Sequence, residues 1–129
     1  MLDMTNDEIV KNYLAAFGAG VPDDVLKKNV IASHNHMWHI FGCGNEPDAE
    51  GDDARRAFDK LSYDEAIIFR GGYSVNNKPR IEDVEICTKI SSATLDYTGD
   101  VYVVDKWFEW TYVNTHEDDF GPYFAYRAK

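Results

Sequence analysis

The segment 101–126 constrains the fold of this chain more than any other, because it holds half of the tryptophan, tyrosine and phenylalanine residues. These residues are Tyr102, Trp107, Phe108, Trp110, Tyr112, Phe120, Tyr123, Phe124 and Tyr126. Aromatic and β-branched residues favour strands, and we predict strands over 101–105, 108–115 and 122–126. In the second strand Phe108, Trp110 and Tyr112 take alternate positions, which places their rings on one face.

Helices are predicted nearer the N-terminus. Thr5 and Glu8 have the spacing of a capping box, and an apolar stripe at helical spacing follows, made of Ile9, Val10, Tyr13, Leu14 and Phe17. Gly18 and Gly20 end that helix, and Pro22 suits the start of a shorter helix over 22–29. A third stripe comprises Ala54, Ala57, Phe58 and Leu61.

The remaining segments give weaker signals. We predict buried strands over 37–41 and 66–69, a turn at Gly71-Gly72 and another at 76–79. The segment 80–86 fits an edge strand or a loop, and 74–98 is the least readable part of the chain. The pattern predicts one domain over 1–129 of the α+β class. Its N-terminal helices pack on a mainly antiparallel sheet that ends in a C-terminal β-meander.

Charge and cysteine content narrow the function. The chain has 13 basic and 23 acidic residues, a formal net charge of −10, which disfavours binding to nucleic acids and anionic membranes. No stretch approaches the roughly 18 apolar residues of a membrane span, and no secretory signal is visible. We therefore expect a cytoplasmic protein. Cys43 and Cys87 form no CxxC pair and are expected to be reduced thiols.

The four histidines are candidate metal ligands or polar groups of a site. His34 and His36 would point to one face of an extended segment and His39 to the other, so these three cannot converge from a straight strand. A zinc site would need His116 or a carboxylate folded back onto one of those faces. The spacing matches no recognised metal signature, so we predict no metal and no cofactor. Neighbouring carboxylates are expected to hold a histidine in a polar network.

Signatures of catalysis are absent from the sequence. There is no G-x-S-x-G element, neither cysteine lies in a known catalytic context, and the glycines form no phosphate-binding loop. Paired carboxylates carry little information in so acidic a chain. We predict no catalytic residues, and an enzyme is the less favoured reading.

Clustered acids and one tryptophan are the candidate partner-binding residues. Lys106 and Trp107 fall at the tip of a predicted hairpin, where Trp107 either folds over the sheet or faces solvent as a binding anchor. The predicted partner-binding set is Glu46, Asp48, Glu50, Asp52, Asp53, Trp107, Glu117, Asp118 and Asp119. Acids in the first turn of a helix also complement its dipole, which is a structural explanation for several of them.

The segments M-W-H-I-F (37–41), A-R-R-A-F-D (54–59) and W-T-Y-V-N-T-H-E with G-P-Y-F further on (110–124) resemble a small bacterial family known only as a domain of unknown function. That resemblance covers most of the chain and implies a bacterial, cytoplasmic, single-domain protein, with no activity or site residues attached. The general profile is also similar to that of bacterial immunity proteins, which are small, acidic and rich in aromatic residues. This second likeness is one of type, not of motif.

These observations favour a non-enzymatic acidic binding protein, an immunity or antitoxin-like inhibitor of a basic toxin or nuclease. The first alternative is a small-molecule-binding domain or enzyme with an aromatic and histidine-lined pocket formed by Trp38, His39, Trp110 and His116. The second alternative is a domain with only a structural or regulatory role. In the favoured reading, opposed potentials steer the basic partner onto the acidic surface.

Overall fold

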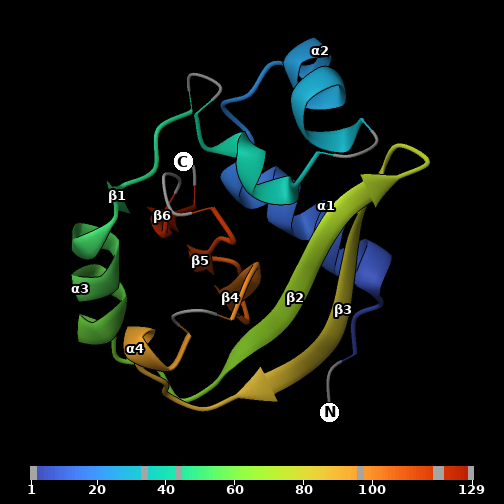
Figure 1. Ribbon diagram of the computed structural model, residues 1–129. Coiled ribbons are helices and arrows are strands. Elements are labelled where there is room, and N and C mark those ends of the chain that lie inside the picture. The colour runs from blue at the N-terminus through green and yellow to red at the C-terminus, as the bar shows by residue number, and fades with distance from the viewer. Residues whose placement is uncertain (1–2, 33–34, 43–44, 96–97, 118–120, 128–129) are drawn as a thin grey trace.

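The computed structural model describes residues 3–32, 35–42, 45–95, 98–117 and 121–127. Among these residues one antiparallel sheet forms the frame, with the strand order β1-β6-β5-β4-β2-β3 (Figure 1). Its strands are β1 (Ala49–Glu50), β2 (Ala66–Val75), β3 (Lys78–Cys87), β4 (Val101–Asp105), β5 (Trp110–Asn114) and β6 (Tyr123–Tyr126). The helical elements are α1 (Asn6–Phe17), α2 (Asp23–Leu26), the π-helical turn η1 (Lys27–Ile31), the 3-10 helix η2 (Met37–Ile40), α3 (Asp52–Lys60) and α4 (Ser92–Leu95). The predicted α+β class and the meander β4-β5-β6 are confirmed.

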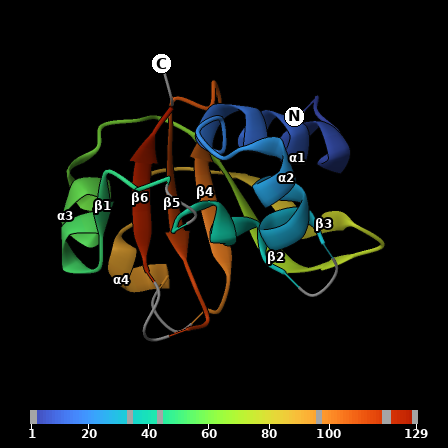
Figure 2. The same cartoon turned by 90° about the horizontal axis from the view of Figure 1, so that it is seen from above.

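Both faces of the sheet are covered. Alternate residues of β4 point to opposite faces, so Tyr102 and Val104 join one buried cluster while Val101 and Val103 join the other. α1, η1 and η2 pack on the first face, and α3 and α4 on the second (Figures 1 and 2). Burial on both faces explains why β4 reads as a continuous apolar run. No helix among the described residues is both long and apolar enough to cross a membrane.

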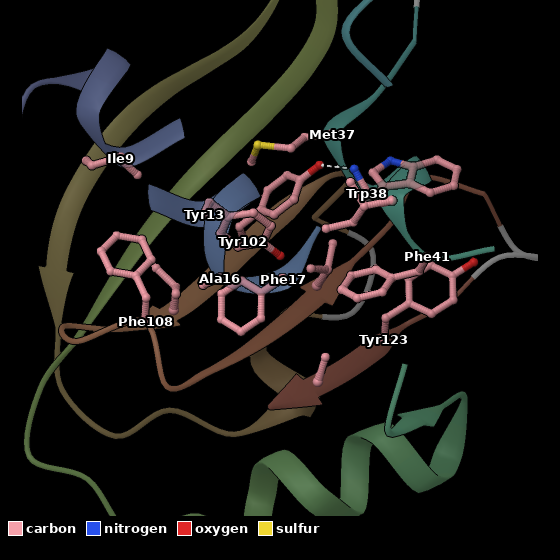
Figure 3. Packing of buried hydrophobic residues seen from close by; sticks show 14 of the residues in the cluster. Ile9, Tyr13, Ala16, Phe17, Met37, Trp38, Phe41, Tyr102, Phe108 and Tyr123 are labelled. Atoms are coloured by element: carbon pink, nitrogen blue, oxygen red, sulfur yellow. Dashed lines mark hydrogen bonds between the residues drawn. The ribbon is translucent and has the colours of Figure 1, made fainter. Parts of the chain in front are cut away.

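Tyr13 and Tyr102 bury their hydroxyls on the first face of the sheet, where each hydroxyl has a hydrogen-bond partner (Figure 3). The hydroxyls of Tyr13 and Thr111 lie 3.0 Å apart, and Thr111 donates to the carbonyl of Val103. The hydroxyl of Tyr102 accepts a 3.0 Å hydrogen bond from the backbone N–H of Trp38. A buried hydroxyl that keeps a partner avoids the cost of desolvation. These bonds therefore fix α1 and η2 against the sheet.

The predicted first helix is confirmed, including its cap. Thr5 Oγ1 accepts from the backbone N–H of Glu8, and Glu8 Oε1 accepts from the N–H of Thr5. α1 then buries Ile9, Tyr13 and Phe17. The second helix begins at Asp23, close to the predicted Pro22, and continues through the π-helical turn to Ile31.

The prediction of a strand over 37–41 is wrong. Met37–Ile40 form the 3-10 helix η2, in which the N–H of His39 donates to the carbonyl of His36. Short apolar runs cannot be assigned to strand or helix by periodicity alone. Met37, Trp38 and Ile40 are all buried, because η2 is enclosed between the sheet and the neighbouring helices.

The turn predicted at Gly71-Gly72 is also wrong, because both glycines lie inside β2. A Cβ at Gly71 would lie 2.4 Å from Cε1 of Tyr102, so the glycine serves a close approach between a strand and a ring. The segment 80–86, for which a strand or a loop was expected, belongs to the edge strand β3. Cys87, the last residue of β3, is a half-buried free thiol, and Cys43 lies outside the described residues.

Phe108 does not share a face with Trp110 and Tyr112. It lies in the turn between β4 and β5 with φ +57° and packs into the first cluster, whereas Trp110 and Tyr112 belong to the second. The left-handed conformation at Phe108 interrupts the strand alternation on which the prediction rested. The turn itself is confirmed, and Trp107 at its tip is 74% exposed.

Candidate functional site

Asp100 and His116 are brought together by the pairing of two strands. Asp100 precedes β4 and His116 follows β5, and the register pairs Val101 with Asn114. Asn114 Nδ2 also donates to the carbonyl of Gly99, which holds the chain just before Asp100. Antiparallel neighbours place the start of one strand beside the end of the next. The two side chains therefore meet at one end of the meander.

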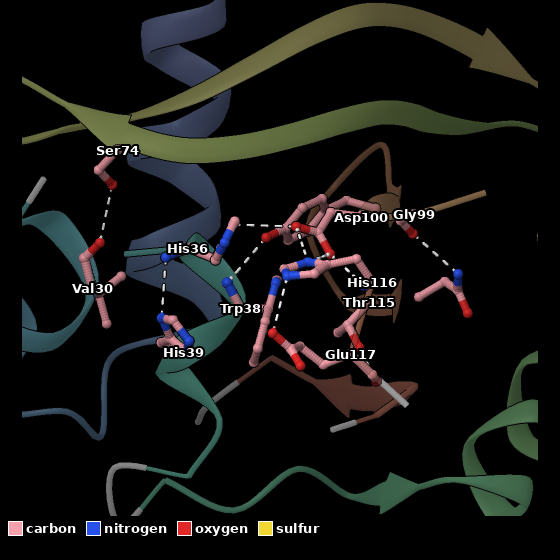
Figure 4. A network of polar contacts seen from close by, with 12 residues as sticks. Val30, His36, Trp38, His39, Ser74, Gly99, Asp100, Thr115, His116 and Glu117 are labelled. Atoms are coloured by element: carbon pink, nitrogen blue, oxygen red, sulfur yellow. Dashed lines mark hydrogen bonds and ion pairs between the residues drawn. The ribbon is translucent and has the colours of Figure 1, made fainter. Parts of the chain in front are cut away.

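The carboxylate of Asp100 is the buried centre of this cluster (Figure 4). Its Oδ1 accepts from the backbone N–H of His116 at 2.7 Å. Nδ1 of His116 lies 2.9 Å from Oδ1 and 3.0 Å from Oδ2, and the side chain of His116 is 43% exposed. Nε2 of His116 lies 3.1 Å from Oε1 of Glu117. Both ring nitrogens of His116 therefore face carboxylates.

His36 completes the cluster from the other side. Its Nδ1 lies 3.2 Å from Oδ2 of Asp100, and its side chain is 19% exposed. Its backbone N–H donates to Nδ1 of His39, and its ring stacks on that of Trp38 with an angle of 11° between the planes. The hydrogen bond from Trp38 to Tyr102 fixes η2 over β4. One side chain from the N-terminal half thus reaches the same carboxylate as His116.

Proton placement follows from this geometry. A neutral imidazole has one N–H and one lone pair, so a neutral His116 would direct a lone pair at one of its two carboxylate partners. The hydrogen bond with Asp100 is the main cause of the raised pKa of His116. Burial, by contrast, lowers the pKa of His36 and of His39. Of the three histidines, His116 is therefore the one whose protonated, positively charged form the cluster favours.

The four residues of the predicted aromatic pocket are not brought into one hollow. Trp38 and His39 line a hollow of about 330 Å³ together with Phe41 and Tyr123. Trp110 lines a different groove and belongs to the cluster on the other face of the sheet. His116 faces Asp100 and is not among the residues that line either space.

The groove that includes Trp110 has a volume of about 680 Å³. The exposed acids Glu46, Asp48 and Glu109 line it, together with Arg127. Aromatic rings also line it, from Phe17, Phe41, Trp110 and Tyr126, and Asn45 and Ala125 complete the wall. The backbone N–H of Tyr126 donates to Asp48 at 2.6 Å, which joins the acidic loop to β6. We call this space the acid-lined groove.

Trp107 lies close to the acid-lined groove. It lines a neighbouring hollow of about 430 Å³, and Arg127 lines both spaces. The guanidinium of Arg127 donates to the carbonyl of Trp107 at 3.3 Å. Tyr126, which is 56% exposed, and Trp107 are two large apolar side chains that the fold leaves in solvent. Exposed aromatic rings beside a groove are typical of binding surfaces.

The other predicted partner-binding acids lie elsewhere. Glu50 of β1 lies opposite Tyr123, the first residue of β6, in the strand register. Glu117 contacts His116. Asp52 and Asp53 occupy the first turn of α3, where they form ion pairs with Arg55 and Arg56. These two acids therefore have the structural role that the helix dipole predicts. Asp118 and Asp119 lie outside the described residues.

Asp100 is a site residue that the sequence did not indicate, as are Glu109, Tyr126 and Arg127 of the groove. The predicted hairpin of 101–105 with 108–115 has a two-residue loop, which sets residue 105 opposite residue 108 and residue 100 opposite residue 113. The observed register instead pairs Val101 with Asn114, which brings Asp100 beside His116. The hairpin was predictable from the sequence, but its register was not, and carboxylates are too common in this chain for Asp100 to stand out.

Fold and site together define a small α+β protein with an antiparallel sheet covered on both faces, an acid-lined groove and a histidine–aspartate cluster around the buried Asp100. The chain belongs to the family described as Domain of unknown function (DUF4275), whose model matches residues 11–124. No curated protein and no solved structure matches it.

Proposed function

We propose that this chain is a non-enzymatic binding protein of the bacterial cytoplasm that holds a basic protein partner in the acid-lined groove. The partner class that fits is a basic toxin or nuclease, which the chain would inhibit in the manner of an immunity protein or antitoxin. The observation that carries the proposal is the groove itself. Three exposed carboxylates line it beside apolar rings, and Trp107 and Tyr126 stand exposed at its side.

The association rate with the partner would depend on the net charge of the chain, and the affinity on contacts in the groove. The net charge of −10 would steer a basic protein toward the chain, which raises the association rate. A lysine or arginine of the partner would then enter between Glu46 and Glu109, with its aliphatic stem against the ring of Trp110. Trp107 would serve as an apolar anchor, because buried tryptophans dominate many interfaces. Occlusion of a basic active site follows from this docking.

Affinity capture with matched bait proteins tests the proposal. The wild-type chain should retain a basic protein from the native host at low salt and release it at about 0.5 M NaCl, where exposed charges are screened. A bait with Glu46→Lys and Glu109→Lys should lose that protein. A control bait with Asp24→Lys and Glu82→Lys changes the net charge equally at exposed positions on α2 and β3. This control bait should keep most of the affinity of the wild-type chain for the retained protein.

The tryptophan is tested in the same assay. Trp107→Ala should weaken retention about 30-fold or more, as expected for a loss of 2 kcal/mol or more at a hot spot. Tyr73→Ala is the control, because Tyr73 is an exposed aromatic residue on β2. Retention that depends on net charge but not on the groove variants would reject the groove as the binding surface.

A failed capture would direct attention to the hollow beside Trp38 and His39. That space of about 330 Å³ falls within the size range of small-molecule sites. A ligand screen by thermal shift, repeated with Trp38→Leu, would then test the alternative of a small-molecule-binding domain or enzyme.

A further inference from the structure

We infer that His36, Asp100 and His116 form a binding site for a divalent transition-metal ion, with Zn²⁺ as the best fit. Each of the three residues offers one ligand atom, and these atoms lie within 4.8 Å of one another. This inference does not depend on the proposed function, because it uses no residue of the acid-lined groove. It also departs from the sequence-based expectation of no metal.

The ligand chemistry fits zinc. Two imidazole nitrogens and one carboxylate oxygen are ligands that Zn²⁺ uses in proteins, and a fourth position would be left for water or another group. In a tetrahedral site with bonds of about 2.0–2.2 Å, neighbouring ligand atoms are roughly 3.3–3.5 Å apart. The closest separations from Asp100 to the two rings are 2.9 Å and 3.2 Å. The two ring nitrogens are held only within 4.8 Å of each other, so a bound ion would also have to draw the two rings together.

The hydrogen bonds of the cluster leave lone pairs for a cation. Zn²⁺ would displace the proton that Asp100 favours on His116, after which Nε2 donates to Glu117 and Nδ1 directs a lone pair at the ion. Among the described residues, the buried Nδ1 of His36 has no hydrogen-bond partner, although it lies beside that same carboxylate. A metal ion placed between these atoms would accept all three lone pairs. Glu117 would then orient the ring of His116, as carboxylates do in many zinc sites.

Two structural features support binding from solution. Asp100 is buried, which gives its negative charge a low-dielectric setting, while the ring of His116 is partly exposed and gives an ion access. A straight strand would not bring His34, His36 and His39 together. In the structure η2 turns the chain after His36, and the β4-β5 register supplies Asp100 and His116 from the other side.

Direct metal titration tests the site. Calorimetry with Zn²⁺ should show one equivalent bound by the full chain, and Co²⁺ should give the visible absorption of a site of low coordination number. Asp100→Asn and His116→Gln should each reduce the affinity for Zn²⁺ by more than about 100-fold, because loss of a direct ligand exceeds the usual effect of an outer-shell change. His116→Gln changes a partly exposed ring and covers the case in which Asp100→Asn fails to fold.

Two controls separate the site from general acidity. His39→Gln removes a neighbouring histidine outside the ligand set and should keep Zn²⁺ affinity within a few-fold of the wild type. Mg²⁺ prefers all-oxygen sites and should not displace Zn²⁺, whereas it would compete at clusters of surface carboxylates. Thermal unfolding should shift upward with Zn²⁺ in the wild type and in His39→Gln only. Absent binding, or equal affinity in all four proteins, would overturn the inference.

Discussion

Gly71 shows how one residue connects the strand to the core. Its backbone lies against the ring of Tyr102, which is fully buried and cannot move freely. That ring stacks on Phe69 at a centroid distance of 5.1 Å, and its hydroxyl is held by the N–H of Trp38. The absence of a side chain at position 71 is therefore a packing requirement.

Replacement of this glycine tests the requirement. Gly71→Ala should lower the free energy of unfolding by about 1–3 kcal/mol, the usual cost of overpacking a filled core. Gly72→Ala is the matched control, because its Cβ would meet only Cβ of Arg80 at 3.9 Å. Urea unfolding of both variants measures the difference. Equal stability of the two variants would show that Tyr102 yields without cost.

At the scale of elements, local signals define α1 and tertiary contacts define η2. The capping box of Thr5 and Glu8 satisfies two backbone N–H groups at the start of α1. η2 depends instead on contacts with distant residues, above all the bond from Trp38 to Tyr102. The edge strands follow a third pattern. β1 has two residues, and β3 carries Pro79 and many charged side chains, which limits pairing with other chains.

The cap of α1 predicts a dependence of stability on pH. Hydrogen bonds from Thr5 hold the pKa of Glu8 below its ordinary value of 4.5. A carboxyl whose pKa is lowered on folding stabilises the protein above the unfolded pKa, and the effect disappears as pH falls through the folded pKa. Glu8→Gln should therefore unfold at a lower temperature than the wild type near pH 7.

The difference in unfolding temperature between Glu8→Gln and the wild type should shrink on acidification and vanish once the pH is below the lowered pKa of Glu8 in the folded protein. Glu82→Gln, on the edge strand β3, provides the comparison for an exposed glutamate outside a helix cap. A gap that stays constant from pH 7 to pH 3 would show that the charge of Glu8 has no part in the cap.

At the scale of the whole molecule, one sheet supports two cores and leaves a few aromatic residues outside both. Phe58 of α3 is fully buried and stacks on Tyr112 at a centroid distance of 4.3 Å. Trp107 is equally apolar but lies in solvent at the β4-β5 turn. Phe58 is therefore expected to contribute to stability, whereas Trp107 is available for contacts at the surface.

Alanine at these two positions should have opposite consequences. Phe58→Ala should lower the free energy of unfolding by about 3–5 kcal/mol, because it leaves a cavity between α3 and the sheet. Trp107→Ala should change it by no more than about 0.5 kcal/mol, as is usual for exposed positions. Chemical denaturation followed by circular dichroism measures both. A large loss at Trp107 would assign this ring to the core and weaken its proposed role as an anchor.

Local patterns in the sequence determined the capped helix, the stripe of α3, the C-terminal meander and the position of the hairpin turn, but not the exposure of Trp107. Each is defined by residues close together in the chain, such as Thr5 with Glu8 or the alternation in 101–105. The family resemblance was likewise visible in residues 110–124, and the family is confirmed. The net charge follows from composition alone, because it does not depend on how the chain folds.

The tertiary structure decided what depends on contacts between distant segments. Whether 37–41 formed a strand or a helix was settled by enclosure of η2 between the sheet and the N-terminal helices. Gly71 and Gly72 joined β2 because they pair with Ile81 and Arg80 of β3, and the ring of Tyr102 fills the space beside Gly71. The meeting of His36 with Asp100 and His116 required strand register and the turn of η2 together. Such convergence is a property of packing, which local periodicity does not encode.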